Sequence, residues 1–136
     1  MADGNTMLRV KKIIESDPER RYVVVSAPGK RFGGDTKITD LLYETFESVK
    51  LTGKPGAAFG KVAERFRGIV HELALDMDID ALLKKTEREI VKEGTADFVA
   101  SRGEYLSGCV MAALLGIPFI DARDVVKFNA EGRLDS

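Results

Sequence analysis

Arg21-Tyr-Val-Val-Val-Ser-Ala-Pro-Gly-Lys30 is the stretch of sequence that decides the predicted fold. It begins with a β-branched and aromatic run, Tyr22–Val25, whose two faces are both apolar, which predicts a buried strand of a parallel sheet. Pro28 and Gly29 end the run, because proline cannot donate to a ladder and glycine permits turn geometry. Ligands of open α/β sheets bind outside the carboxyl ends of the strands, so Ser26 stands where a binding residue is expected.

The composition limits the class of protein. The chain has 136 residues, enough for one domain, and its 44% hydrophobic and 32% charged residues are typical of a soluble globular protein. A formal net charge of −1 gives no reason to expect a nucleic acid or an anionic membrane as partner, and no apolar run is long enough to span a bilayer. One cysteine excludes an intrachain disulfide, and one cysteine with one histidine argues against a Cys/His metal site. These features predict a cytosolic α/β domain.

Helical periodicity surrounds the predicted strand. Asn5 or Thr6 is expected to cap a first helix at residues 7–16, and Thr39 to open a second at residues 39–50. Arg65 is expected to face outward from a third helix, at residues 57–75. Short strands are expected at Phe119–Asp121 and Val125–Phe128. The predicted helices are Met7–Ser16, Thr39–Lys50, Ala57–Leu75, Ile79–Val91 and Thr95–Leu115, the last with a break at Ser101-Arg102-Gly103. A helix that feeds a parallel strand implies an earlier strand, so we expect the chain to be incomplete.

Three positions could carry chemistry, and each has a purely structural alternative. Ser26, with the backbone N–H groups that follow it, could hold a phosphate or carboxylate, or could simply belong to a turn. Thr39 could present a helix N-terminus to a ligand anion, or could be an ordinary N-cap. Glu104, beside the glycine of the expected helix break, could reach an ammonium group or cap the helix. His71 is expected at the surface and Cys109 in the core.

Four motifs follow one another along the chain: Tyr22-Val-Val-Val-Ser-Ala-Pro-Gly-Lys30, Asp35-Thr-Lys-Ile-Thr-Asp-Leu-Leu-Tyr43, Ser101-Arg-Gly-Glu-Tyr-Leu-Ser107 and Ile117-Pro-Phe-Ile-Asp-Ala-Arg123. In this order and spacing they resemble the aspartokinases of the amino acid kinase superfamily, over essentially the whole chain. The resemblance implies a partial three-layer α/β/α fold with a mostly parallel sheet and many helices. Residues 1–136 would then form the aspartate-binding, N-terminal portion of an incomplete amino acid kinase domain.

The same resemblance implies a reaction and its substrate. Aspartokinases transfer a phosphoryl group from Mg-ATP to the side-chain carboxylate of L-aspartate, giving 4-phospho-L-aspartate, the first step toward lysine, threonine and methionine. Family members bind aspartate through residues that correspond to Ser26, Thr39 and Glu104 in this sequence. Two hydroxyl groups would donate to the anionic substrate, and one carboxylate would meet its α-ammonium group. A cytoplasmic homo-oligomer is also implied.

The sequence departs from the family pattern at both ends. Aspartokinases begin with a strand ending in Lys-Phe-Gly-Gly-Ser/Thr-Ser, whose lysine stabilises the transferring phosphoryl group. Arg31-Phe32-Gly33-Gly34 looks similar but follows the second strand, and Lys127-Phe128 lacks the glycines. The later Gly-Arg-Gly-Gly-Ser-Asp segment, the nucleotide-binding half and the regulatory ACT domains have no counterpart here. Because phosphoryl transfer depends on positioning and charge neutralisation, no catalytic residue is assigned, and we expect this chain alone to be inactive and to bind neither ATP nor Mg²⁺ tightly.

Two alternatives stay open. The chain could belong to a kinase for another small acid, such as glutamate or a carbamate. It could also be a non-catalytic binding or dimerisation module, with the long amphipathic helix Ala57–Leu75 as its dimer face. An absent first strand would leave the edge of the second strand unpaired, which predicts marginal stability or self-association through that edge.

Overall fold

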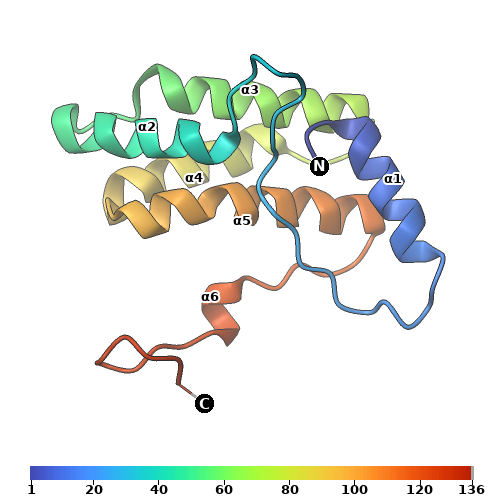
Figure 1. Cartoon of the computed structure of the whole chain (residues 1–136). Helices are drawn as coiled ribbons and strands as arrows, with labels where there is room; N and C mark the ends of the chain where they lie inside the picture. Colours follow the sequence, from blue (N-terminus) through green and yellow to red (C-terminus); the bar gives the residue numbers. More distant parts are fainter. Residues whose placement is uncertain (136) are drawn as a thin grey trace.

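Helices account for the regular structure of this computed structural model, which describes residues 1–135 (Figure 1). Ser136, the last residue of the predicted domain, lies outside the described residues. In the bundle, α2 packs on α3 and α5, α4 packs against α3 and α5, and α1 contacts both α3 and α5. The helices are α1 (Gly4–Glu15), α2 (Ile38–Thr52), α3 (Gly56–Glu72), α4 (Ile79–Glu93), α5 (Ala96–Leu115) and the short α6 (Ala122–Val125). None of them is long and apolar enough to cross a membrane, within the part of the chain described.

The helix ends show how the local sequence sets the boundaries. The first helix is capped by Asp3 rather than by Asn5 or Thr6: the Thr6 N–H donates to Asp3 Oδ1 at 2.8 Å, and the Asp3 N–H donates to Thr6 Oγ1 at 3.2 Å. This reciprocal pair is a capping box, which satisfies two N–H groups that the helix leaves without partners. At the C-terminal end of α4, Gly94 adopts a left-handed conformation (φ 62°) and terminates the helix as the sequence predicts.

The predicted parallel sheet and the three-layer α/β/α arrangement are wrong for the chain as described. Within residues 1–135 no sheet forms, and the pairing between strand-like segments is limited to an isolated antiparallel bridge between Phe128 and Leu134. Residues 119–121 are not a strand. The second short strand, expected at residues 125–128, does not form either: Val125 is the last residue of α6, and Phe128 takes part only in the isolated bridge. A strand needs a neighbour to satisfy its backbone N–H and C=O groups. Within the described residues, no segment pairs with residues 22–26 in a ladder.

Residues 22–28 instead form an extended segment that crosses the bundle in front of α5 and leads toward α2 (Figure 1). Val23 and Val25 are partly buried against the core, whereas Tyr22 is 90% and Val24 98% exposed. Extended backbone sends alternate side chains to opposite sides, and the helices cover one side. The prediction that both faces of this run are buried is therefore wrong.

Two details near the predicted site also differ from expectation. The fifth helix runs without a break from Ala96 to Leu115, because Gly103 keeps helical geometry and the Ser101 hydroxyl donates to the Phe98 carbonyl at 2.7 Å. The second helix begins at Ile38 with Lys37 as its N-cap, so Thr39 lies within the first turn and is not the cap.

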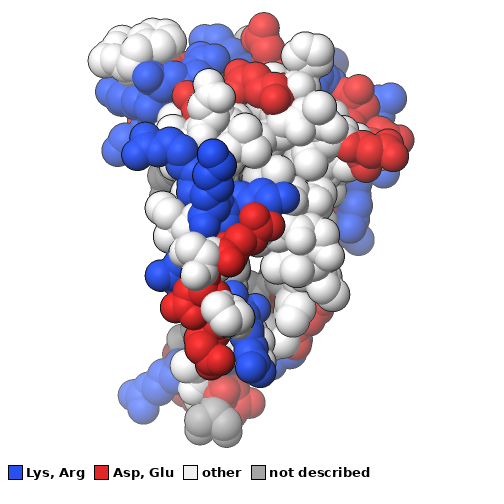
Figure 2. Space-filling model, turned by 90° about the vertical axis from the view of Figure 1, so that its right-hand side faces the viewer, with Lys and Arg blue, Asp and Glu red and all other residues white. Residues whose placement is uncertain are grey.

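Figure 2 shows one face of the molecule, seen from the right-hand side of Figure 1. Acidic and basic side chains are intermingled there, beside a broad surface that carries no charge. The charges of this face therefore do not separate into large areas of one sign, in agreement with the near-neutral net charge of −1.

Candidate functional site

The surroundings of the three predicted site residues converge at Gly103 on α5. A Cβ atom added at Gly103 would lie 2.7 Å from Ala27 Cβ and 3.4 Å from Ile38 Cγ2. The backbone of α5 therefore closely approaches both the residue after Ser26 and the residue before Thr39. Only glycine, which has no Cβ, permits an approach this close.

Polar contacts reinforce this convergence. The Ala27 N–H donates to Glu104 Oε1 at 3.4 Å, a long hydrogen bond, and the Ile38 N–H donates to the Pro28 carbonyl at 3.2 Å. Ser26 and Glu104 are exposed and Thr39 is half-buried, so all three remain open to a ligand. The structure thus brings the three sequence segments together, each contributed by a different element.

The start of α2 has the electrostatic character of an anion-binding end. No side chain caps it, so the first N–H groups of the helix have no side-chain partner. Aligned peptide dipoles place partial positive charge at such an end, which favours a carboxylate or a phosphate nearby. Asp40 in the first turn already supplies one exposed negative charge.

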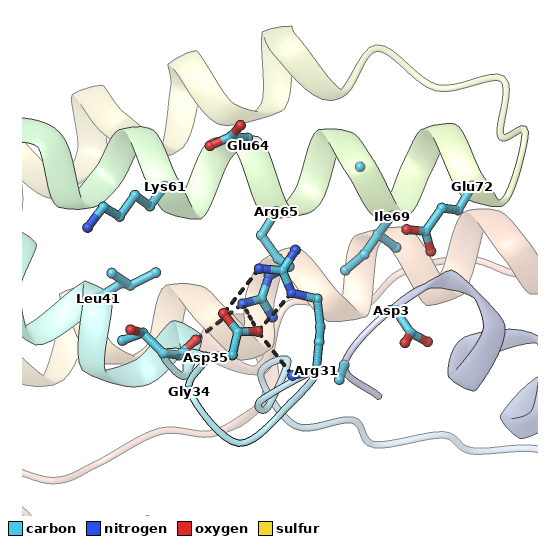
Figure 3. A pocket seen from close by; sticks show the side chains of 13 residues that line it. Asp3, Arg31, Gly34, Asp35, Leu41, Lys61, Glu64, Arg65, Ile69 and Glu72 are labelled. Carbon is cyan, nitrogen blue, oxygen red and sulfur yellow. Dashed lines mark hydrogen bonds and ion pairs between the residues drawn. The ribbon is translucent and has the colours of Figure 1, made fainter.

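Arg65 on α3 is a polar residue that sequence reasoning placed incorrectly. It was expected to face outward, but its side chain is only 5% exposed (Figure 3). Its guanidinium donates to the Gly29 carbonyl at 2.9 Å, to Asp35 Oδ2 at 2.7 Å and to the Thr36 carbonyl at 3.2 Å. All three acceptors lie in the loop of residues 29–37, which joins the extended segment to α2. Helical periodicity carries no signal for this contact, because the loop is distant in sequence.

Asp35 is the shared carboxylate of this loop. Besides Arg65 it accepts hydrogen bonds from Arg31, through the backbone N–H at 3.0 Å, Nε at 2.7 Å and Nη2 at 3.1 Å (Figure 3). The hydrogen bonds from Arg31, aided by the charge of Arg65, hold the pKa of the Asp35 carboxyl well below its usual range. Burial, together with the charge of Arg31, lowers the pKa of Arg65. We call Arg31, Asp35 and Arg65 the loop clamp.

A pocket of about 530 Å³ opens beside the loop clamp, between α3, the loop and the start of α1 (Figure 3). Basic and acidic side chains both line it, namely Arg31, Lys61 and Arg65 with Asp3, Asp35, Glu64 and Glu72. The lining includes none of Ser26, Thr39 and Glu104, so this pocket is not the predicted substrate site. All three members of the loop clamp contribute to its wall.

A second buried arginine lies within the Ser-Arg-Gly-Glu motif. Arg102 is 2% exposed, and its guanidinium lies over the rings of Phe98 and Tyr105, at 4.3 and 4.6 Å from their centroids. Its Nη1 is 4.0 Å from Glu89 Oε2, and Arg123 approaches the same oxygen at 4.0 Å. Burial lowers the pKa of Arg102. This cluster connects α4 and α5 to the segment that follows α5. Within it, Arg102 and Tyr105 flank Glu104 in sequence.

The described residues do not fit a metal centre. Among residues 1–135 no group of three or more His, Cys, Asp or Glu side chains is arranged to hold a metal ion. His71 is exposed, and Cys109 is only partly buried, with its thiol pKa raised by burial.

Two aspartate kinases are among the proteins to which this chain is similar. The chain is 43% identical over 79 residues to aspartokinase 3 of Bacillus subtilis, which is 58% of this chain and 17% of that protein. The crystal structure of the aspartate kinase of Clostridium acetobutylicum superimposes with a TM-score of 0.92 at 44% identity, and covers 98% of this chain. The chain spans 31% of the length of that structure. No family model matches the chain.

Proposed function

Since this chain is related to the aspartokinases and corresponds to one section of them, we propose that it contributes the aspartate-binding portion of an aspartate kinase. In this proposal residues 1–136 are an incomplete amino acid kinase domain, and Ser26, Thr39 and Glu104 contact L-aspartate. The observation that carries it is the close approach at Gly103, which gathers the three segments into one place.

The chemistry of the three side chains suits this substrate. The hydroxyl groups of Ser26 and Thr39 donate to a carboxylate, and the uncapped start of α2 adds partial positive charge. The Glu104 carboxylate accepts a charge-assisted hydrogen bond from the α-ammonium group. The complete reaction would transfer a phosphoryl group from Mg-ATP to the side-chain carboxylate, with residues that this chain does not supply. Alone, the chain is then inactive.

Two further properties belong to the same proposal. A kinase that draws on ATP and carries one free cysteine suits the cytoplasm, where thiols stay reduced. The complete enzyme would be a homo-oligomer.

Titration with L-aspartate, followed by NMR of the isotope-labelled chain, tests the proposal. We expect shifts confined to residues near Ser26, Thr39 and Glu104. Glu104→Gln should weaken binding by about tenfold or more, because a hydrogen bond to a charged group contributes about 1.5–3 kcal/mol. Glu44→Gln, an exposed change on α2, serves as the matched control.

Succinate, which lacks the α-ammonium group, separates the role of Glu104 from a general effect on the site. The unmodified chain should prefer aspartate to succinate, and Glu104→Gln should lose this preference. L-glutamate in the same titration tests the alternative substrate class. Shifts scattered over the surface, or none, would contradict the proposed site, and aspartate-dependent ATP turnover by the chain alone would contradict its inactivity.

A further inference from the structure

We propose that Arg65 is a positioning residue for substrate binding: its guanidinium fixes the loop of residues 29–37 so that Ser26 and Thr39 face the same ligand molecule. This inference rests on the proposed function, because it concerns the same aspartate site. Arg65 itself touches the loop and not the substrate.

The geometry supports the inference directly. Gly29 lies three positions after Ser26, and Thr36 lies three positions before Thr39. One guanidinium binds the carbonyl oxygens of both, at 2.9 and 3.2 Å, so the two ends of the loop are held at a fixed separation. The backbone hydrogen bond from Ile38 to Pro28 closes the same gap at 3.2 Å.

The interior of the loop is closed by the other two members of the loop clamp. Asp35 binds Arg65 at 2.7 Å and also accepts the backbone N–H of Arg31 at 3.0 Å. The Asp35 N–H donates to the Phe32 carbonyl at 3.1 Å, which completes a turn. The loop clamp therefore orders the connection at its ends and at its centre.

Packing alone does not account for an arginine at this position. Burying a guanidinium is costly, and apolar residues of similar volume commonly replace buried ion pairs without loss of stability. The apolar side chains around it on α3, Val62, Phe66 and Ile69, already form part of the core. What arginine adds is a planar fork with several donors, which a lysine ammonium does not reproduce.

The test measures L-aspartate affinity by NMR titration for the unmodified chain, Arg65→Ala and Arg65→Lys. We expect Arg65→Ala to bind aspartate at least about tenfold more weakly than the unmodified chain. Arg65→Lys should have an affinity between those two values. Amide hydrogen exchange of Asp35 and Ile38 should accelerate in both variants. Arg67→Gln is the matched control, because it removes an exposed guanidinium of the same helix that pairs with Asp80 at 2.7 Å.

Guanidinium ion tests whether the loss of affinity comes from the missing guanidinium group of Arg65. The neighbouring pocket gives this ion access to the space that Arg65→Ala opens. Millimolar guanidinium chloride should recover aspartate affinity in Arg65→Ala, whereas sodium chloride at equal concentration should not. Recovery with guanidinium and not with sodium would show that the cation replaces the missing side chain, because the two salts have the same ionic strength.

The outcomes separate the two proposals. If the unmodified chain binds aspartate and Arg65→Ala binds it equally well, or loses affinity that guanidinium does not recover, the positioning role is refuted and the aspartate site stands. If the unmodified chain does not bind aspartate, the proposed function fails and this inference fails with it.

Discussion

Gly103→Ala tests the close approach that assembles the candidate site. The added methyl group would lie 2.7 Å from Ala27 Cβ, 3.3 Å from Leu42 Cδ1 and 3.4 Å from Ile38 Cγ2. Leu42 can change rotamer to make room. Ala27 Cβ is attached directly to the backbone, so the extended segment itself must move.

Two opposing effects decide the sign of the change in unfolding free energy. Replacing a helical glycine by alanine contributes about 1 kcal/mol of stability through helix propensity. Forcing a methyl group into a filled space costs about 1–3 kcal/mol. For Gly103→Ala the second effect should prevail, with a net loss of about 1 kcal/mol. Gly60→Ala on α3 adds the same methyl group where no atom lies within 4 Å, and should gain about 1 kcal/mol.

Urea unfolding followed by far-UV circular dichroism measures both variants on the same scale. The two identical substitutions should differ by about 2 kcal/mol, which exceeds the error of such curves. Ala27→Gly in the Gly103→Ala background removes the clashing atom, so a double-mutant cycle should show favourable coupling. If Gly103→Ala stabilises the chain as much as Gly60→Ala does, the extended segment does not pack on α5 as described, and the proposed site loses its basis.

The remaining predictions concern individual polar contacts. Asp35→Asn should destabilise the chain at neutral pH, measured by urea unfolding, and the deficit should shrink as the pH falls below about 4. The sign follows from the lowered pKa of Asp35: its stabilising effect is complete above the unfolded-state pKa and is lost on acidification, so a deficit independent of pH would contradict it. Lys11→Met removes the hydrogen bond from Nζ to the Leu114 carbonyl at 3.0 Å and should cost about 0.5–1.5 kcal/mol in the same assay. Arg9→Met, an exposed change on the same helix, should alter the unfolding free energy by no more than about 0.5 kcal/mol, and equal losses would argue against the Lys11–Leu114 hydrogen bond.

The helices could be predicted from the sequence because their signals are local. Apolar residues at helical spacing set the buried face of α3, and a glycine after the last turn sets the end of α4. The cap of α1 was also readable, since Asp3 and Thr6 have the spacing of a capping box. The expected caps, Asn5 and Thr6, place the start of α1 too late, because the helix begins at Gly4.

The sheet and the loop clamp could not be predicted, because both depend on distant partners. The run at residues 22–25 favours extended backbone, and the structure is extended there, but a sheet needs a second strand whose presence a single run does not reveal. The helical pattern places Arg65 among the surface residues of α3, but in the structure a loop that lies 30 residues earlier in the sequence covers it. The motifs single out Ser26, Thr39 and Glu104 as candidates, whereas the contacts of Arg65 with the loop leave no signal in the sequence.

The alternation of residues 22–27 has a consequence for the tolerated length of this segment. A one-residue deletion at Val24 would exchange the faces of the residues before it, so that Val23 would face solvent and Tyr22 would face the helices. Deleting two residues would keep the alternation but shorten the reach from α1 to α2 by roughly 7 Å. Related sequences should therefore conserve the number of residues between α1 and Pro28 more strictly than the identity of the exposed side chains.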